Sequence, residues 1–195
     1  MRRGFQRAAT RALPARHDAA LEERLRHKMA RWRLPGLPPR VARLVLARLR
    51  GLRGRVQPRA HAACIRVLWN GVLTDRRFQR DAAARGCLLG CNGAEDSLEH
   101  YARCPCLRAV AHTSLRLDMP VGEFYVAFFL AGPRMNDEAA LRPRWQRMAL
   151  LHYALHRTLC AARAHPAWQP QGMAVAALRQ ALREGLIPLP TSGTA

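Results

Sequence analysis

The feature that most constrains this chain is a group of cysteine and histidine residues near its middle. Residues 87–106 read CLLGCNGAEDSLEHYARCPC and hold four of the six cysteines, together with His100. Such a group forms a metal site, a set of disulfides or a cluster of free thiols. The sequence has no run of 18 apolar residues and no secretory signal, so we expect a reducing compartment, where clustered cysteines bind metal more often than they form disulfides.

The spacing of these residues favours a metal site. Three residues separate Cys87 from Cys91, in a turn-prone segment, and three separate His100 from Cys104. Positions four apart face the same side of a helix, so we expect His100 and Cys104 to project together from a short helix. Asp96 or Ser97 would cap that helix.

Three thiolates and one imidazole suit tetrahedral Zn²⁺, and a shell closed by four protein ligands makes the ion structural. The alternative fourth ligand is Cys106, but Cys104 shares the expected helix face with His100, whereas Cys106 follows Pro105. A further interpretation is a group of packed or free thiols with His100 on the surface. We predict that Zn²⁺ is held by Cys87, Cys91, His100 and Cys104.

Apolar periodicity predicts a mostly α fold: a small helical domain around the Cys3His zinc knuckle, with flexible termini. No strong strand pattern is present. A short helix would begin at Thr74 and end at Gly86, and the stretch from Phe124 to Leu130 is apolar throughout. Longer helices are expected over about residues 17–32, 39–52, 59–70, 143–164 and 173–184. The predicted organisation is a basic helical extension (1–57), a zinc-binding module (58–110), a helical C-terminal region (111–185) and a disordered tail (186–195).

The charge of the chain indicates a polyanionic partner. It has 33 basic and 13 acidic residues, a formal net charge of +20, and residues 1–59 carry 17 of the basic side chains but only 3 of the acidic ones. Every basic residue except Lys28 is arginine, so codon bias offers a second explanation for the charge. We expect RNA or DNA to be bound through its phosphate backbone, without base readout. The predicted phosphate contacts are Arg40, Arg43, Arg50, Arg53 and Arg55.

Several motifs around the cluster resemble a known domain. WNGVLTDRRFQ (residues 69–79) precedes the cysteine pair, and EDSLEH (residues 95–100) and RCP (residues 103–105) follow it. Together they resemble the zinc-binding domain downstream of the polymerase in non-LTR retrotransposon reverse transcriptases, over about residues 58–108. By position, the resemblance implies the same four zinc ligands. It also implies a parent protein that handles element RNA and target DNA during reverse transcription, although CxxxC replaces the usual CxxC here.

Nothing else in the sequence predicts catalysis. The aspartates are isolated from one another, and Lys28 lacks the neighbouring aspartate that a nuclease would need. No phosphate-binding loop or nucleophile elbow occurs, so we do not expect an enzyme. On the helix over 143–164, His152, His156 and Cys160 recur every four residues, and we expect them to pack rather than bind metal. His61 and Cys64 are likewise expected on a partly buried helix face.

The leading hypothesis is therefore a zinc-stabilised nucleic-acid-binding module without polymerase or nuclease activity. One alternative is a structural or protein-interaction module in which zinc only holds the fold, and another is a decayed retroelement fragment with no independent function. We expect an intracellular protein, nuclear or cytoplasmic. Residues 1–17 are also typical of a mitochondrial transit peptide, because no acid precedes Asp18 and arginine is mixed with alanine, phenylalanine and leucine.

Overall fold

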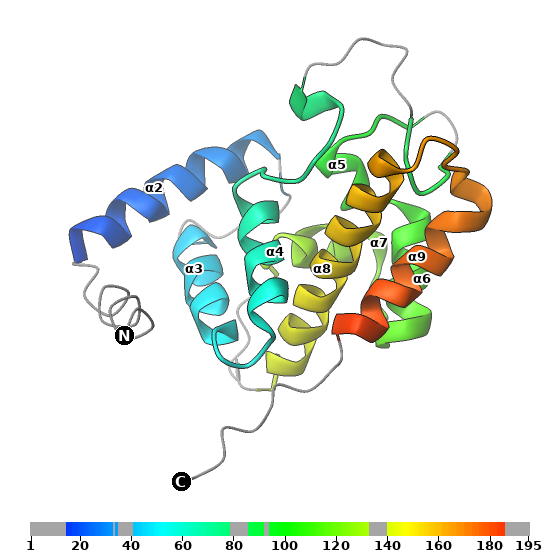
Figure 1. Ribbon diagram of the computed structural model, residues 1–195. Helices are drawn as coiled ribbons and strands as arrows, with labels where there is room; N and C mark the ends of the chain where they lie inside the picture. Colours follow the sequence, from blue (N-terminus) through cyan, green and yellow to red (C-terminus); the bar gives the residue numbers. More distant parts are fainter. Residues whose placement is uncertain are drawn as a thin grey trace, which may run out of the picture.

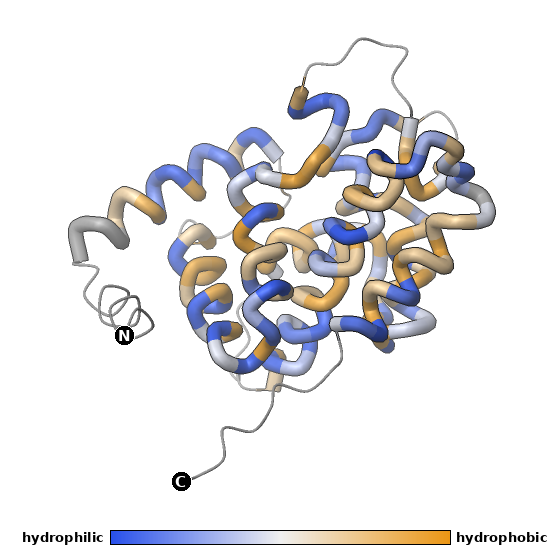
Figure 2. Tube along the Cα trace, viewed as in Figure 1, coloured by the Kyte–Doolittle hydropathy of each residue, from blue (hydrophilic) through white to orange (hydrophobic). Residues whose placement is uncertain are grey.

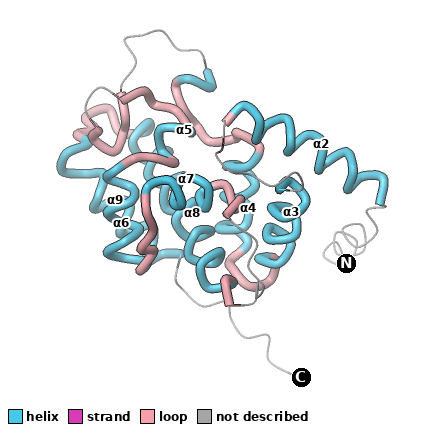
Figure 3. The backbone as a smooth tube through the Cα atoms, turned by 180° about the vertical axis from the view of Figure 1, so that it is seen from behind, coloured by secondary structure: helices cyan, strands magenta, loops and turns pink. Residues whose placement is uncertain are grey.

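A computed structural model describes residues 15–32, 34, 41–78, 86–91, 94–132 and 140–185. Within these residues the secondary structure is helical and contains no strand, as Figure 3 shows from behind. The predicted mostly α fold around a Cys3His group is thus confirmed. The described elements are α2 (Ala15–Arg31), α3 (Val41–Leu52), α4 (Pro58–Leu68), the 3-10 helix η1 (Arg76–Phe78), α5 (Leu98–Tyr101), α6 (Pro105–Leu115), α7 (Val121–Phe128), α8 (Arg142–Ala164) and α9 (Pro170–Gly185).

Helix α8 runs through the middle of the fold, with α4 and α9 packed against it (Figure 1). Each residue from Leu151 to Leu155 is buried, so the middle of the helix is covered on every side. A helix surrounded in this way needs apolar residues around its whole circumference rather than one stripe. Burial of a leucine such as Leu151 stabilises the fold by about 1.5–3 kcal/mol.

Helix α2 attaches to this core through one apolar stripe. Leu25 and Met29 of α2 are buried, as is Trp32, which follows the helix, while hydrophilic residues cover much of the rest of α2 (Figure 2). The Trp32 ring stacks on Phe129 with 4.1 Å between the ring centroids. The Tyr125 hydroxyl donates to the Trp32 carbonyl at 2.5 Å. The N-terminal helix is therefore fastened to α7 and the residues that follow it.

Two helices were not assigned from the sequence. Helix α6 begins at Pro105, whose fixed φ and missing N–H suit the first position of a helix. Helix α7 includes most of the apolar stretch around Phe124, which lacks a polar face and so gave no helical period. Helix α6 packs against α9 and α8 (Figure 1).

The described parts of the predicted segments 1–57, 58–110 and 111–185 share one apolar core. Buried residues of α2, α3, α4 and α6 to α9 belong to a single cluster that also includes Cys87 and Cys104. The division into segments stays a prediction about the sequence. The expected tail at 186–195 and the first 14 residues lie outside the described residues, and of the helix expected to start at Thr74 only η1 lies within them.

Candidate metal centre

The structure brings the four predicted ligands together. One ligand atom from each of Cys87, Cys91, His100 and Cys104 lies within 4.8 Å of all the others. Cys87 and Cys91 come from the segment 86–91, His100 from α5, and Cys104 from the residue before α6. All six cysteines of the chain are free thiols, so the group is not a disulfide knot.

The distances between the sulfur atoms fit coordination of one ion. Cys104 Sγ lies 3.3 Å from Cys91 Sγ and 4.0 Å from Cys87 Sγ. Thiolates on a tetrahedral ion with metal–sulfur bonds of about 2.3 Å lie about 3.8 Å apart, close to these values. His100 Nε2 is buried without a hydrogen-bond partner. A buried imidazole nitrogen left unpaired is costly, and a metal ion would satisfy it.

The electrostatics of the thiols show what an ion would add. The pKa of Cys87 falls to about 4, because the Cys104 thiol stabilises its thiolate more than burial disfavours it, with the His100 ring contributing further. Burial raises the pKa of Cys91 to about 11. Hydrogen bonding to Cys87 and burial raise the pKa of Cys104. The site alone thus favours one thiolate, and a divalent cation would supply the charge that ionises the others.

The local geometry of the second pair differs from the prediction. Helix α5 ends at Tyr101, and Cys104 is the N-cap residue of α6, with φ −58° and ψ 121°. The expectation that His100 and Cys104 share one helix face was therefore wrong. The reason is Pro105, because a residue that precedes proline is pushed out of the helical region. Ser97 caps α5 as predicted, with its hydroxyl accepting from the His100 N–H at 3.2 Å.

Cys106 lies close to the group without belonging to it. Its Sγ is 3.7 Å from Cys91 Sγ, and its side chain lies in the first turn of α6. The structure groups Cys104, not Cys106, with the other three ligands. Cys106 is thus a neighbouring thiol on the side of Cys91.

A buried polar network holds the segment before α5 in place. Asp96 is fully buried, and its carboxylate accepts from the Asp75 N–H at 2.8 Å and from the Tyr101 hydroxyl at 2.5 Å. Arg163 of α8 forms an ion pair with the same carboxylate and a longer one, at 3.4 Å, with Asp75. The Asp96 contact with α8 therefore anchors the helix that carries His100.

The cysteine loop has a second anchor. The Trp168 indole N–H, from the turn between α8 and α9, donates to the Leu88 carbonyl at 3.0 Å. Sequence reasoning missed Asp96, Arg163 and Trp168 as supports of the site. Asp96 lies far from the other two residues in the chain, so their spacing gives no signal. The only local hint is that Asp96 is an acidic residue directly before the N-cap residue Ser97.

The predicted phosphate contacts lie on or after α3. Arg43, Arg50, Arg53 and Arg55 are exposed, and Arg40 lies outside the described residues. Arg43 pairs with Glu22 at 3.7 Å. Their contact with nucleic acid stays a prediction.

Arg48, on the same helix, has a structural role instead. It is 5% exposed, and its guanidinium donates to the carbonyls of Leu130 and Gly132 at 2.8 and 2.7 Å. It also lies 4.2 Å above the Trp145 ring. Some of the positive charge of the chain is thus used inside the fold.

The histidines and cysteines that were expected to pack do so, and the described residues form no second metal group. They are His61, Cys64, His152, His156 and Cys160. His152 is fully buried, with Nδ1 3.3 Å from the Cys64 sulfur and Nε2 2.8 Å from the Phe128 carbonyl. His61 Nε2 lies 3.0 Å from the Leu49 carbonyl. His156 contacts Cys160 at 3.9 Å. Packing explains all of them.

Burial of His152 predicts a pH-dependent stability. Burial lowers its pKa to about 4, whereas an unfolded histidine titrates near 6.5. Below pH 6.5 the unfolded chain therefore binds a proton that the folded chain excludes, and stability falls as the pH drops toward 4. We expect this group to remove about 2 kcal/mol between pH 7.5 and 5.

Urea unfolding of the wild type and His152→Gln at several pH values measures this contribution. Between pH 7.5 and 5, His152→Gln should lose about 2 kcal/mol less of its free energy of unfolding than the wild type loses. The variant itself is less stable than the wild type at neutral pH. His112→Gln, at an exposed position, should keep the wild-type slope. Parallel slopes for the wild type and His152→Gln would contradict the assignment.

The fold and the cluster define a class of protein: a helical chain with a Cys3His centre that can bind a metal ion. No protein-family model, curated protein or solved structure matches the chain. Among the described residues, every helix is too short or too polar to span a membrane.

Proposed function

We propose that the protein is a zinc-stabilised nucleic-acid-binding module, without polymerase or nuclease activity of its own. The observation that carries the proposal is the buried, unpaired His100 Nε2 among three thiols, in a chain with a net charge of +20. Zinc is the metal of choice because it accepts thiolate and imidazole together in a closed tetrahedral shell. A closed shell gives the ion a structural role.

The role of zinc would be to stabilise a region with little regular structure of its own. The segment 86–91 has no helix, and α5 has 4 residues. Such elements gain little from their own hydrogen bonds, so metal ligation would contribute much of their folding free energy. The rigid centre would then hold nearby arginines in position for phosphates.

The resemblance to the domain downstream of the polymerase in non-LTR retrotransposons supports the nucleic-acid partner. Its motifs place the same four residues at the metal and imply a parent that handles RNA and DNA. The alternative is a structural or protein-interaction zinc module. It is favoured by the buried Arg48, which shows that part of the charge serves the fold.

Metal analysis and a binding titration test the proposal together. We expect one zinc ion for each purified chain. Gel shifts with RNA, single-stranded DNA and duplex DNA should show binding that weakens between about 50 and 200 mM salt. Five phosphate contacts would require a loss of about 100-fold for single strands and about 500-fold for duplex DNA. A zinc-loaded protein that binds none of the three would favour the structural module. A protein without metal would contradict the proposal itself.

A further inference from the structure

A polar cleft lies beside the candidate metal centre, between the end of α2, η1 and α5. It has a volume of about 280 Å³ and is lined by Arg31, Arg76, Arg77 and Glu99, among others. These residues come from the end of α2, from η1 and from α5, which meet at the top of Figure 1. Glu99 directly precedes the candidate ligand His100, so cleft and metal centre share one helix.

Backbone contacts hold the arginines of η1 at the cleft. The Arg76 N–H donates to the Asp96 carbonyl at 3.3 Å, and the Arg77 N–H donates to the Thr74 hydroxyl at 3.3 Å. The Asp75 N–H donates to the buried Asp96 carboxylate. The 3-10 helix is thus fixed to the residues that lead into α5, and hence to the candidate metal centre.

A second contact positions Arg31. The Lys28 ammonium, one turn earlier on α2, donates to the Trp69 carbonyl at the end of α4, at 3.2 Å. This contact keeps the C-terminal end of α2 against the segment that leads to η1. The three arginines therefore converge from two anchored elements rather than from a free loop.

The cleft has an excess of positive charge. Arg76 pairs with Glu95 at 3.2 Å and with Glu99 at 4.0 Å. Within the part of the chain that the structure describes, neither Arg31 nor Arg77 forms an ion pair with a carboxylate. Guanidinium groups bind phosphate oxygens through paired hydrogen bonds, so this arrangement suits a phosphodiester.

An exposed aromatic ring stands next to these charges. Phe78 is 46% exposed, and the Arg77 guanidinium lies 5.5 Å from the centre of its ring. Two other large apolar side chains are exposed among the described residues, Ile65 and Val121, and neither is aromatic. An aromatic ring beside arginines is the combination that binds unpaired bases together with their backbone. An acidic peptide would use the charges but not the ring.

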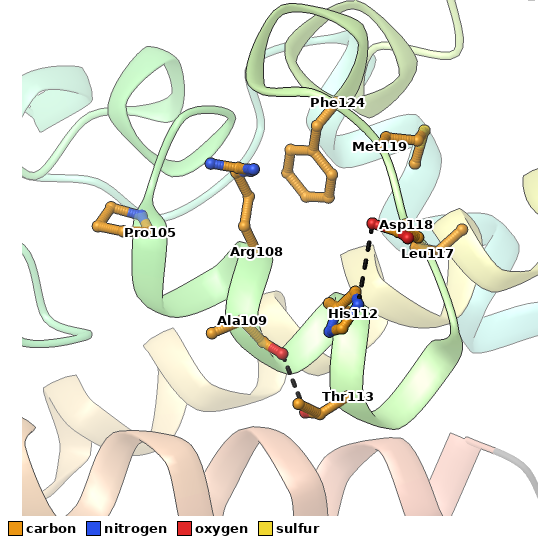
Figure 4. A pocket seen from close by; sticks show the side chains of 9 residues that line it. All are labelled: Pro105, Arg108, Ala109, His112, Thr113, Leu117, Asp118, Met119 and Phe124. Carbon is orange, nitrogen blue, oxygen red and sulfur yellow. Dashed lines mark hydrogen bonds and ion pairs between the residues drawn. The ribbon is translucent and has the colours of Figure 1, made fainter.

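Another cavity, somewhat larger than the cleft, has a different chemistry. It has a volume of about 330 Å³, and apolar residues such as Leu117, Met119 and Phe124 form much of its wall. Figure 4 shows that its histidine, His112, is turned toward Asp118, with 3.8 Å between them. One arginine, Arg108, lines it. This cavity lacks the concentration of positive charge found at the cleft.

We propose that the cleft binds the backbone of a single-stranded nucleic acid, with Arg31, Arg76 and Arg77 on phosphates and Phe78 stacked on a base. The inference rests on the proposed function and gives it a site and a preferred strand form. Duplexes keep their bases stacked inside, so they would engage the arginines but not Phe78. Single strands should therefore bind more tightly than duplexes of the same sequence.

Fluorescence anisotropy with a labelled mixed-sequence oligonucleotide tests the site, using the full zinc-loaded chain. The cleft variant is Arg31→Gln/Arg76→Gln/Arg77→Gln. The control is Arg142→Gln/Arg147→Gln/Arg179→Gln, which removes the same charge from exposed positions on α8 and α9. We expect the cleft variant to bind single strands about 10- to 100-fold more weakly, with a salt slope lower by about 2. The control should lose far less.

The stacking contact has its own variant. Phe78→Leu keeps an apolar side chain of similar size, and we expect it to weaken single-strand binding about 10-fold while duplex binding stays unchanged. The cleft variant and Phe78→Leu should both keep the zinc content and the unfolding midpoint of the wild type. The reason is that Arg31, Arg76, Arg77 and Phe78 are all exposed.

The outcomes separate this inference from the proposed function. If the wild type binds no nucleic acid, the proposed function fails. If the wild type binds but the two triple variants weaken equally, binding is diffuse and the cleft inference is overturned. Displacement of the oligonucleotide by inorganic phosphate alone, or by an acidic peptide at equal charge concentration, would also overturn it.

Discussion

Cys104→Ser should abolish binding of the proposed zinc ion and lower the free energy of unfolding by about 4 kcal/mol or more. Loss of a metal site is one of the few single changes with an effect of this size. Cys104 is fully buried between Cys87 and Cys91, so no solvent molecule can replace its sulfur without cost. Metal analysis beside urea unfolding measures both effects.

Cys106→Ser is the matched control, because it makes the same chemical change two positions away. It should keep one zinc ion for each chain and unfold close to the wild type. Treating the wild type with a chelator should reproduce the instability of Cys104→Ser. Full zinc content in Cys104→Ser, with loss in Cys106→Ser, would assign the fourth ligand to Cys106 instead.

Asp96→Ala should destabilise the fold by about 3–5 kcal/mol, the usual cost of removing one member of a buried ion pair. The change removes the carboxylate that Arg163, the Tyr101 hydroxyl and the Asp75 N–H share. Asp96→Asn keeps an acceptor oxygen of similar shape, so its loss should be smaller. Urea unfolding of the zinc-loaded proteins measures the difference.

Asp118→Ala provides the control for that prediction. The Asp118 side chain is 89% exposed and lies 3.8 Å from His112, and an exposed pair contributes about 1 kcal/mol at most. If Asp96→Ala were no more destabilising than Asp118→Ala, the network would not support the fold as described.

Local signals predicted much of the helical structure. The stripe of Leu25 and Met29, the cap at Ser97 and the proline at the start of α8 act over a few residues, so the sequence shows them directly. The sequence analysis assigned no helix to the residues after Cys104, and α6 begins there at Pro105. Proline ends one element and begins another, and the sequence alone shows both possibilities.

Chemistry and spacing predicted the grouping of Cys87, Cys91, His100 and Cys104, although His100 and Cys104 do not share the expected helix face. What spacing could not show was the support around the site. Asp96 meets Arg163 only because α8 packs beside α5, and Arg48 is buried only because α3 faces the end of α7. Such contacts depend on tertiary packing, which overrides the usual tendency of arginine to lie in solvent.

The Trp168 contact with Leu88 has a consequence for the order of events during synthesis. Cys87, Cys91, His100 and Cys104 all emerge from the ribosome before Arg163 and Trp168, because the chain is made from its N-terminus. The ligands are thus available to an ion while their distant anchors are still missing. An ion bound at that stage would hold the cysteine loop before α8 has been synthesised. The contacts of Arg163 and Trp168 with the site would form only when nearly all of the described chain has left the ribosome.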